Sequence, residues 1–217
     1  MNKHLFLILI LIVVSSVDGQ WIKQTVNTTA SFRGLSVVNE KVVWASGTGG
    51  TVIRTVDGGK AWDVIIIPGA EKLDFRDVEA FDANTAYILS IGNGADSRIF
   101  KTIDGGKTWK EQFRNANEKA FFDAIACWTA EHCIAMSDPV DGHYVLINTT
   151  DGDTWNPIVS NKLPAAKDGE AIAASIVPAM IRAQAFIARA PAQTETPTLR
   201  SSRASAPARE RPRARDV

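Results

Sequence analysis

The sequence predicts an all-β protein built from repeated units of short antiparallel strands. The first observation is a motif with a fixed period: Asp57, Asp104 and Asp151 each begin a Gly-containing turn, and 47 residues separate each from the next. Such a period is the signature of an array of similar supersecondary units. The second observation is that residues 20–165 lack helical periodicity of useful length, whereas a short β-rich run precedes each turn.

Each copy of the motif predicts a β-hairpin that folds a tryptophan onto the core. Glycine supplies a positive φ without steric cost, and an Asp side chain can accept hydrogen bonds from the turn that it begins. The tryptophan opens the extended stretch after the turn. The hairpin residues are Asp57, Gly59 and Trp62, then Asp104, Gly106 and Trp109, and finally Asp151 and Trp155 in a copy one residue shorter.

These copies resemble the Asp-box, or bacterial neuraminidase repeat, with the pattern Ser/Thr-x-Asp-x-Gly-x-Thr-Trp. Residues 55–62 and 102–109 match it, except that Ala61 replaces the Thr. The pattern is found in sialidase-like β-propellers and in photosystem II stability/assembly factor-like proteins. The resemblance implies a β-propeller in which the box is a structural hairpin on the blade rim, away from any active site.

Three predicted blades follow one another, near residues 32–63, 75–110 and 122–156. Four short strands in roughly 45 residues are typical of a propeller blade. The predicted strands are innermost 32–38, 75–81 and 122–128, second 42–46, 86–90 and 133–137, and third 51–55, 98–102 and 144–148, with a fourth after each box Trp. Because a ring closes with about 4–8 blades, three blades predict an incomplete, truncated propeller.

Residues 1–19 have the features of a secretory signal. Lys3 and His4 precede an unbroken apolar run, Leu5 to Val14, and small polar residues follow it. The run is about ten residues long, too short for the roughly twenty that span a bilayer. We therefore predict a secreted or periplasmic protein without a membrane span after cleavage. An uncleaved anchor is the alternative.

Residues 20–27 are predicted to form an outer strand of a distant blade. Trp21 precedes Phe32 much as Trp62 precedes Phe75, so Trp21 occupies a box-Trp position although its box is missing. Many closed propellers let the N-terminal strand complete the last blade. We expect residues 20–27 to await a blade at the far end of the chain.

Residues 171–217 differ from the rest in composition. They hold eight Arg, no Lys and no Gly. Such a shift predicts a low-complexity, disordered tail. We favour a slip of the reading frame near 171–175, which would make the tail a non-native product, and a genuine basic tail is the alternative.

Charge is divided between two parts of the chain. Residues 20–170 carry 15 basic and 20 acidic side chains, a net charge of −5, which argues against nucleic-acid binding. Residues 171–217 carry 8 basic and 3 acidic side chains, a net charge of +5. No motif indicates a cofactor, and we expect none.

The two cysteines, Cys127 and Cys133, flank a short loop between the first two strands of the third unit. Behind a secretory signal the compartment is oxidising, so a cross-strand disulfide is predicted, with two free thiols as the alternative. A metal site with His132 would lack a fourth ligand, and we expect none.

The candidate binding residues are Arg33, Arg76 and Asp123. Each follows the Phe that begins an innermost strand. In a propeller this position lies near one mouth of the central channel, where ligands usually dock. The alternative is that these side chains pair with one another across neighbouring blades.

No catalytic residues are predicted. Sialidases need an arginine cluster, a Tyr nucleophile with a Glu partner, and an Asp acid/base. Residues 32–35 resemble the Phe-Arg-Ile-Pro motif only faintly, because the Pro is absent, and Tyr87 and Tyr144 lie in strand-like runs. Asp138, Asp141 and His143 gather in one stretch, which we interpret as a turn between strands.

The predicted function is that of an interaction scaffold similar to photosystem II stability/assembly factor-like proteins, binding a protein partner or a carbohydrate. Open blade edges also allow self-association. The alternative is a fragment of a sialidase-type glycoside hydrolase whose catalytic residues lie in missing blades. A nonfunctional truncated product is the third hypothesis.

Overall fold

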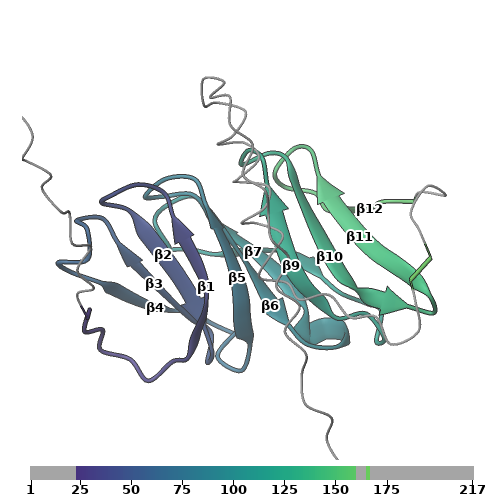
Figure 1. The fold of residues 1–217 in the computed structure, drawn as a ribbon, viewed down its shortest axis with the longest axis horizontal. Helices are drawn as coiled ribbons and strands as arrows, with labels where there is room; N and C mark the ends of the chain where they lie inside the picture. The colour runs from purple at the N-terminus through teal and green to yellow at the C-terminus, as the bar shows by residue number, and fades with distance from the viewer. Residues whose placement is uncertain (1–22, 160–164, 167–217) are drawn as a thin grey trace, which may run out of the picture.

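The computed structural model describes residues 23–159 and 165–166, and it confirms an all-β chain of three four-stranded antiparallel sheets (Figure 1). The first sheet contains β1 (Phe32–Val37), β2 (Val43–Gly47), β3 (Thr51–Thr55) and β4 (Asp63–Ile66). The second contains β5 (Asp74–Ala80), β6 (Ala86–Ile91), β7 (Arg98–Thr102) and β8 (Lys110–Arg114). The third contains β9 (Phe122–Cys127), β10 (Cys133–Val140), β11 (His143–Thr149) and β12 (Asn156–Pro157).

Within each sheet the strands pair in chain order, so every sheet is an antiparallel meander. The described residues contain one short helical element, the 3-10 turn η1 (Gly94–Asp96) between β6 and β7. No helix in the described part of the chain is long and apolar enough to cross a membrane. The predicted signal at 1–19 and tail at 171–217 lie outside the described residues.

The three sheets stand side by side in chain order, as consecutive propeller blades do (Figure 1). The inner strands of the second and third blades contact the blade before them: β5 lies against β1 and β2, and β9 lies against β5 and β6. The outer faces of the first and third blades have no neighbouring blade among the described residues. The array is therefore an open ring, as predicted.

Two hydrophobic clusters hold the array together, one at each junction between blades. The first includes Trp44, Phe75 and Ile88, and the second includes Tyr87 and Phe122. Because successive side chains of a strand point to opposite faces, β6 contributes Ile88 to one cluster and Tyr87 to the other. The central blade is thus buried on both faces.

The segment before β1 contains no strand within its described residues, although residues 20–27 were predicted to form one. The Gln24 side chain of this segment nevertheless lies beside the first turn, because a Cβ added to Gly59 would be 3.1 Å from Gln24 Oε1. In the second blade, the equivalent Cβ on Gly106 would be 2.6 Å from Ile65 Cδ1, which belongs to β4, the outer strand of the preceding blade. Gln24 therefore lies where the outer strand of a preceding blade would lie. Since the blade it would complete is not among the described residues, the outer strand stays a prediction.

Candidate functional site

The three Asp-Gly turns share one hydrogen-bond pattern. In the first, Thr55 Oγ1 donates to Asp57 Oδ1 at 2.8 Å, and the amides of Gly59 and Ala61 donate to Thr55 Oγ1 and Asp57 Oδ1 at 2.9 and 3.0 Å. The shorter third turn keeps the pattern, with Thr149 Oγ1 donating to Asp151 Oδ1 at 2.9 Å. Loss of one residue therefore leaves its Thr–Asp core intact.

These hydrogen bonds favour the ionised form of each turn carboxylate. The Ala61 amide and the Thr55 hydroxyl lower the pKa of Asp57. The Thr108 hydroxyl and amide lower the pKa of Asp104 to about 2, and the Thr154 and Asp153 amides lower that of Asp151. Because the turn carboxylates stay ionised and accept hydrogen bonds within the turn, they stabilise the turn and are unsuited to proton transfer.

The tryptophans after the second and third turns pack on the preceding blade. Trp109 meets Trp44 edge to face with ring centroids 6.3 Å apart, and Trp155 meets Tyr87 at 6.0 Å. The Trp155 indole also donates to Gln112 Oε1 at 3.1 Å. These residues join blades, which is a structural role.

Tyr87 is fully buried and donates its hydroxyl to the carbonyls of Ala130 and Gly152 at 2.7 and 2.9 Å. Burial and the charge of Asp153 raise the pKa of Tyr87. A hydroxyl that is committed to two carbonyls and resists ionisation is a poor nucleophile. Tyr87 is therefore a core residue.

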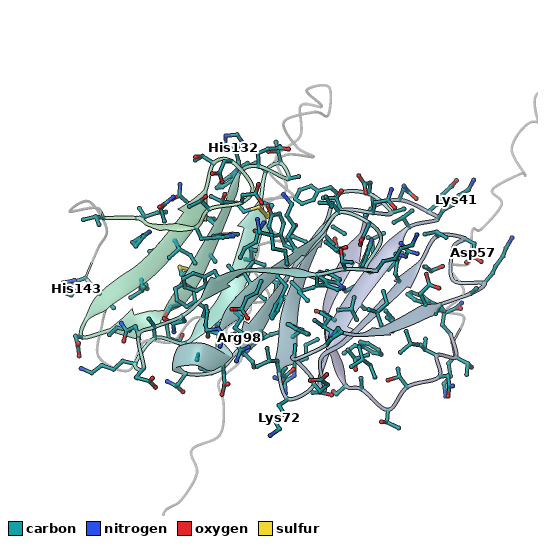
Figure 2. All side chains as sticks on the ribbon, turned by 180° about the vertical axis from the view of Figure 1, so that it is seen from behind. Lys41, Asp57, Lys72, Arg98, His132 and His143 are labelled. Atoms are coloured by element: carbon teal, nitrogen blue, oxygen red, sulfur yellow. A yellow bond between two sulfur atoms is a disulfide. The ribbon has the colours of Figure 1, made fainter. Side chains whose placement is uncertain are left out.

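The turns and the starts of the inner strands lie at opposite ends of the blades. Lys41 and His132, in loops after inner strands, lie at one end, and Lys72, which precedes β5, lies at the other (Figure 2). The Gly58 amide donates to the Lys41 carbonyl at 3.0 Å, which places the first turn at the Lys41 end. A ligand at the starts of the inner strands would not contact the turns.

Each inner strand contains a β-bulge at its start, and the three bulged residues are Arg33, Arg76 and Asp123. Pairing skips from Phe32 to Gly34 in β1, from Phe75 to Asp77 in β5, and from Phe122 to Ala124 in β9. Bulges re-aim side chains and are frequent beside active sites. We identified these residues in the sequence by their position after Phe, but the sequence did not predict the bulges.

Each bulged arginine has an acidic neighbour in the following blade, and of the two only Asp74, the neighbour of Arg33, was missed by sequence reasoning. Arg33 forms an ion pair with Asp74 of the next blade, at 3.3 Å. Burial raises the pKa of Asp123, and Arg76 opposes that rise, which places its guanidinium within electrostatic reach of this carboxyl in the following blade. Pairing across blades, the alternative to ligand binding, thus accounts for part of each side chain's environment. We name the set Arg33, Asp74, Arg76, Asp123 and Asp138 the bulge edge.

Asp123 is the most confined member of the bulge edge. It is 2% exposed, and its Oδ1 has no hydrogen-bond partner among the described residues. Burial and the neighbouring charge of Asp138 raise the pKa of Asp123 to about 6, against the opposing effect of Arg76. Below this pH the carboxyl is protonated and can donate a hydrogen bond, and above it the group is an acceptor.

The approach of Asp138 to Asp123 corrects our interpretation of residues 138–143 as a turn. Strand β10 continues through Pro139 to Val140, and the turn itself is limited to Asp141, with φ of 50°, and Gly142. Ser137 pairs with Phe122, so Asp138 lies level with the start of β9. Counting residues along an extended β10 would have placed Asp138 at the bulge edge.

Cys127 and Cys133 occupy paired positions on β9 and β10 and form a disulfide, with their Cα atoms 4.0 Å apart. The loop that they close contains Ala130, whose carbonyl accepts the Tyr87 hydroxyl. The disulfide therefore borders the junction between the second and third blades. In the described residues, no group of three or more His, Cys, Asp and Glu side chains could hold a metal ion.

No known protein family matches the sequence, and no curated protein matches it. Among solved structures, the chain is similar to "YCF48 bound to D1 peptide", with a TM-score of 0.50 and 19% identity over 66% of this chain and 45% of that chain. It is also similar to YCF48 from Cyanidioschyzon merolae, with a TM-score of 0.49 and 19% identity over 63% and 42%.

A GH74 xyloglucanase from Xanthomonas campestris matches with a TM-score of 0.41 and 16% identity, over 55% of this chain and 19% of that chain. At 19% identity, the similarity to YCF48 bound to D1 peptide shows the fold alone. The chain has a β-propeller fold, and it spans less than half the length of the YCF48 structures that it matches.

Proposed function

We propose that this chain is a propeller scaffold that binds a segment of a protein partner at the bulge edge, without catalysis. The observation that carries the proposal is the bulge at the same position of all three inner strands. Bulges re-aim side chains instead of continuing the ladder, and these three lie at the starts of the inner strands, at one end of the array.

The chemistry of the bulge edge suits a polypeptide with charged side chains. Arg33 is exposed and offers a guanidinium, although Asp74 partly neutralises it. The half-buried Asp138 offers a carboxylate close by, while Asp123 is buried and affects the charge of the edge. YCF48, which has a similar fold, has been solved bound to a D1 peptide, and this supports a peptide ligand for the present array.

We also propose that the protein acts outside the cytoplasm, because residues 1–19 have the features of a secretory signal. Mass spectrometry of the exported protein should then show an N-terminus at Gln20. Full-length protein retained in the cytoplasm would contradict this proposal.

A glycoside hydrolase is the second candidate, and one observation favours it. Asp123 and Asp138 are neighbouring carboxyls, and the raised pKa of Asp123 is typical of an acid/base pair. We place it second because Asp123 is almost fully buried, whereas an acid/base must reach its substrate. Release of sugar from xyloglucan or a sialoside, abolished in Asp123→Asn, would establish this candidate over the scaffold.

The scaffold proposal is tested by selecting peptides from a display library on the purified protein and measuring their affinity by fluorescence anisotropy. Arg33→Glu and Arg76→Glu should each weaken binding about tenfold or more, since each reverses a charge at the bulge edge. Lys41→Glu, a charge reversal at the opposite end of the blades, should leave affinity unchanged. Equal binding by all three variants would show that the bulge edge is not the site.

A further inference from the structure

The junction between neighbouring blades is built the same way twice. In each blade, the first inner-strand residue after the bulge pairs with a residue of the second strand. Two positions before that partner, the second strand carries a residue on the side where the following blade packs. This residue is Trp44 in β2, Tyr87 in β6 and Ile134 in β10. We name the side that carries it the forward face and the opposite side the back face.

Trp44 and Tyr87 make the same two contacts with the next blade. Trp44 Nε1 donates to the Asp82 carbonyl at 3.0 Å and its ring packs on Trp109. The Tyr87 hydroxyl donates to the Ala130 carbonyl and its ring packs on Trp155. Each junction thus binds a loop carbonyl and the box tryptophan of the following blade.

A basic side chain on the third strand completes each junction. Arg54 pairs with Trp44, lies 5.4 Å from its ring and donates to the Ala83 carbonyl at 2.8 Å. Lys101 pairs with Tyr87, lies 5.0 Å from its ring and donates to the Gly152 carbonyl at 2.9 Å. The third blade has Asn148 at this position, opposite Ile134.

The forward face of the third blade remains apolar and partly exposed. Met136 and Leu146 are paired there and are both half-buried. Their counterparts in the second blade, Leu89 and Ile99, are 0% exposed because the third blade covers them. Half-buried apolar side chains where the other blades bury theirs indicate a face that accepts another blade.

The back face of the first blade shows the complementary features. Leu35 and Val37 on β1 are 67% and 54% exposed, whereas Val78, the counterpart of Leu35 in β5, is 1% exposed. This face is built to receive a preceding blade.

We propose that a second copy of this chain covers these faces, the first blade of one copy docking on the third blade of the other. The two faces are the halves of the junction that the chain already makes twice, so the new contact continues an established interface. Head-to-tail contacts give rings when the rotation closes. Two copies supply six blades, within the range of about 4–8 that closes a propeller.

The test measures the solution mass of the full chain by analytical ultracentrifugation over a range of concentrations. The wild-type protein should be a dimer of the 23.5 kDa chain. Leu35→Asp and Leu146→Asp each place a charge in the contact and should weaken dimerisation about a hundredfold or more. Ile103→Asp, on an exposed turn residue of the central blade, is the matched control and should remain dimeric.

Mixing the two variants tests the head-to-tail geometry. Leu35→Asp retains an intact forward face and Leu146→Asp an intact back face, so the mixture should form a dimer through one contact. If the third blades instead paired with each other, Leu35→Asp alone would remain dimeric. Circular dichroism shows whether each variant keeps its β structure.

A gain of affinity provides an independent test. Ile134→Tyr with Asn148→Lys recreates the Tyr87 and Lys101 pair, and it should strengthen the dimer about tenfold by reaching loop carbonyls of the partner's first blade. A wild-type monomer at all concentrations, or a dimer that none of these substitutions changes, overturns the proposal.

Discussion

A single carboxylate organises each hairpin turn, and this makes the turns sensitive to acid. Asp104 accepts hydrogen bonds from the Thr108 hydroxyl at 2.6 Å and the Thr108 amide at 2.9 Å. These donors hold its pKa at about 2, below the usual 3.8. Because the folded pKa is the lower one, ionised Asp104 stabilises the fold above about pH 4, and the contribution is lost as pH falls through about 2.

Asp104→Asn should therefore lower the melting temperature at pH 7, and the difference from wild type should shrink toward pH 2. Thermal melts followed by circular dichroism between pH 2 and 7 measure it. Asp141→Asn, which removes an exposed ion pair with Lys119, is the control and should have little effect, since such pairs contribute little. An Asp104 effect that is the same at every pH would contradict this account.

The residues of the turns could be predicted from the sequence because local chemistry determines them. Asp57, Asp104 and Asp151 each bond within eight residues of chain, so the motif carries the geometry with it. The environment of Asp123 could not be predicted in this way. It depends on Asp138 from the neighbouring strand and Arg76 from the neighbouring blade, and no local pattern specifies those distances.

At the scale of strands, boundaries were predictable where a turn ends them sharply. Strands β3 and β7 have the predicted bounds, 51–55 and 98–102, because an Asp-Gly turn follows each. Strand β10 extends beyond the predicted 137 to Val140, since its pairing with β11 is irregular between Ser137 and Val140 and an irregular ladder tolerates Pro139. Strand β12 is two residues long and ends at Pro157, which has no amide hydrogen to donate.

The hydroxyl of Tyr87 links β6 to two loops of the third blade, and its removal measures what this junction contributes. Tyr87→Phe removes both hydroxyl bonds, after which the Gly152 carbonyl keeps its bond from Lys101 at 2.9 Å and the Ala130 carbonyl keeps only the longer one from Lys101 at 3.4 Å. We expect the free energy of unfolding to fall by about 1–3 kcal/mol, measured by urea denaturation. Trp128→Phe, in the exposed part of the same loop, should change it little. Equal effects of the two substitutions would show that the hydroxyl bonds are not what joins the blades.

For the whole molecule, the period of the motif predicted the architecture, because each blade repeats the same local folding problem. The period does not show which exposed faces are covered in solution. Leu35 and Val78 both read as strand residues, yet one is exposed and the other buried. The difference comes from the presence or absence of a neighbouring blade, which is a property of the assembly.

This difference predicts a gradient of stability across the array. The central blade is covered on both faces, and the Tyr87, Ile88 and Leu89 side chains of β6 are all 0% exposed. Strand β10 alternates buried and half-buried residues, and β11 is paired with only two residues of β12. Backbone amides in β6 should therefore exchange with solvent most slowly, and those of β10 and β11 faster, when hydrogen exchange is measured on dilute protein.

Since a docked second copy would cover the forward face of the third blade, exchange in β10 and β11 should slow as protein concentration rises, whereas exchange in β6 stays unchanged. Uniform exchange across the three blades at low concentration would contradict the gradient and show that the array unfolds as one unit.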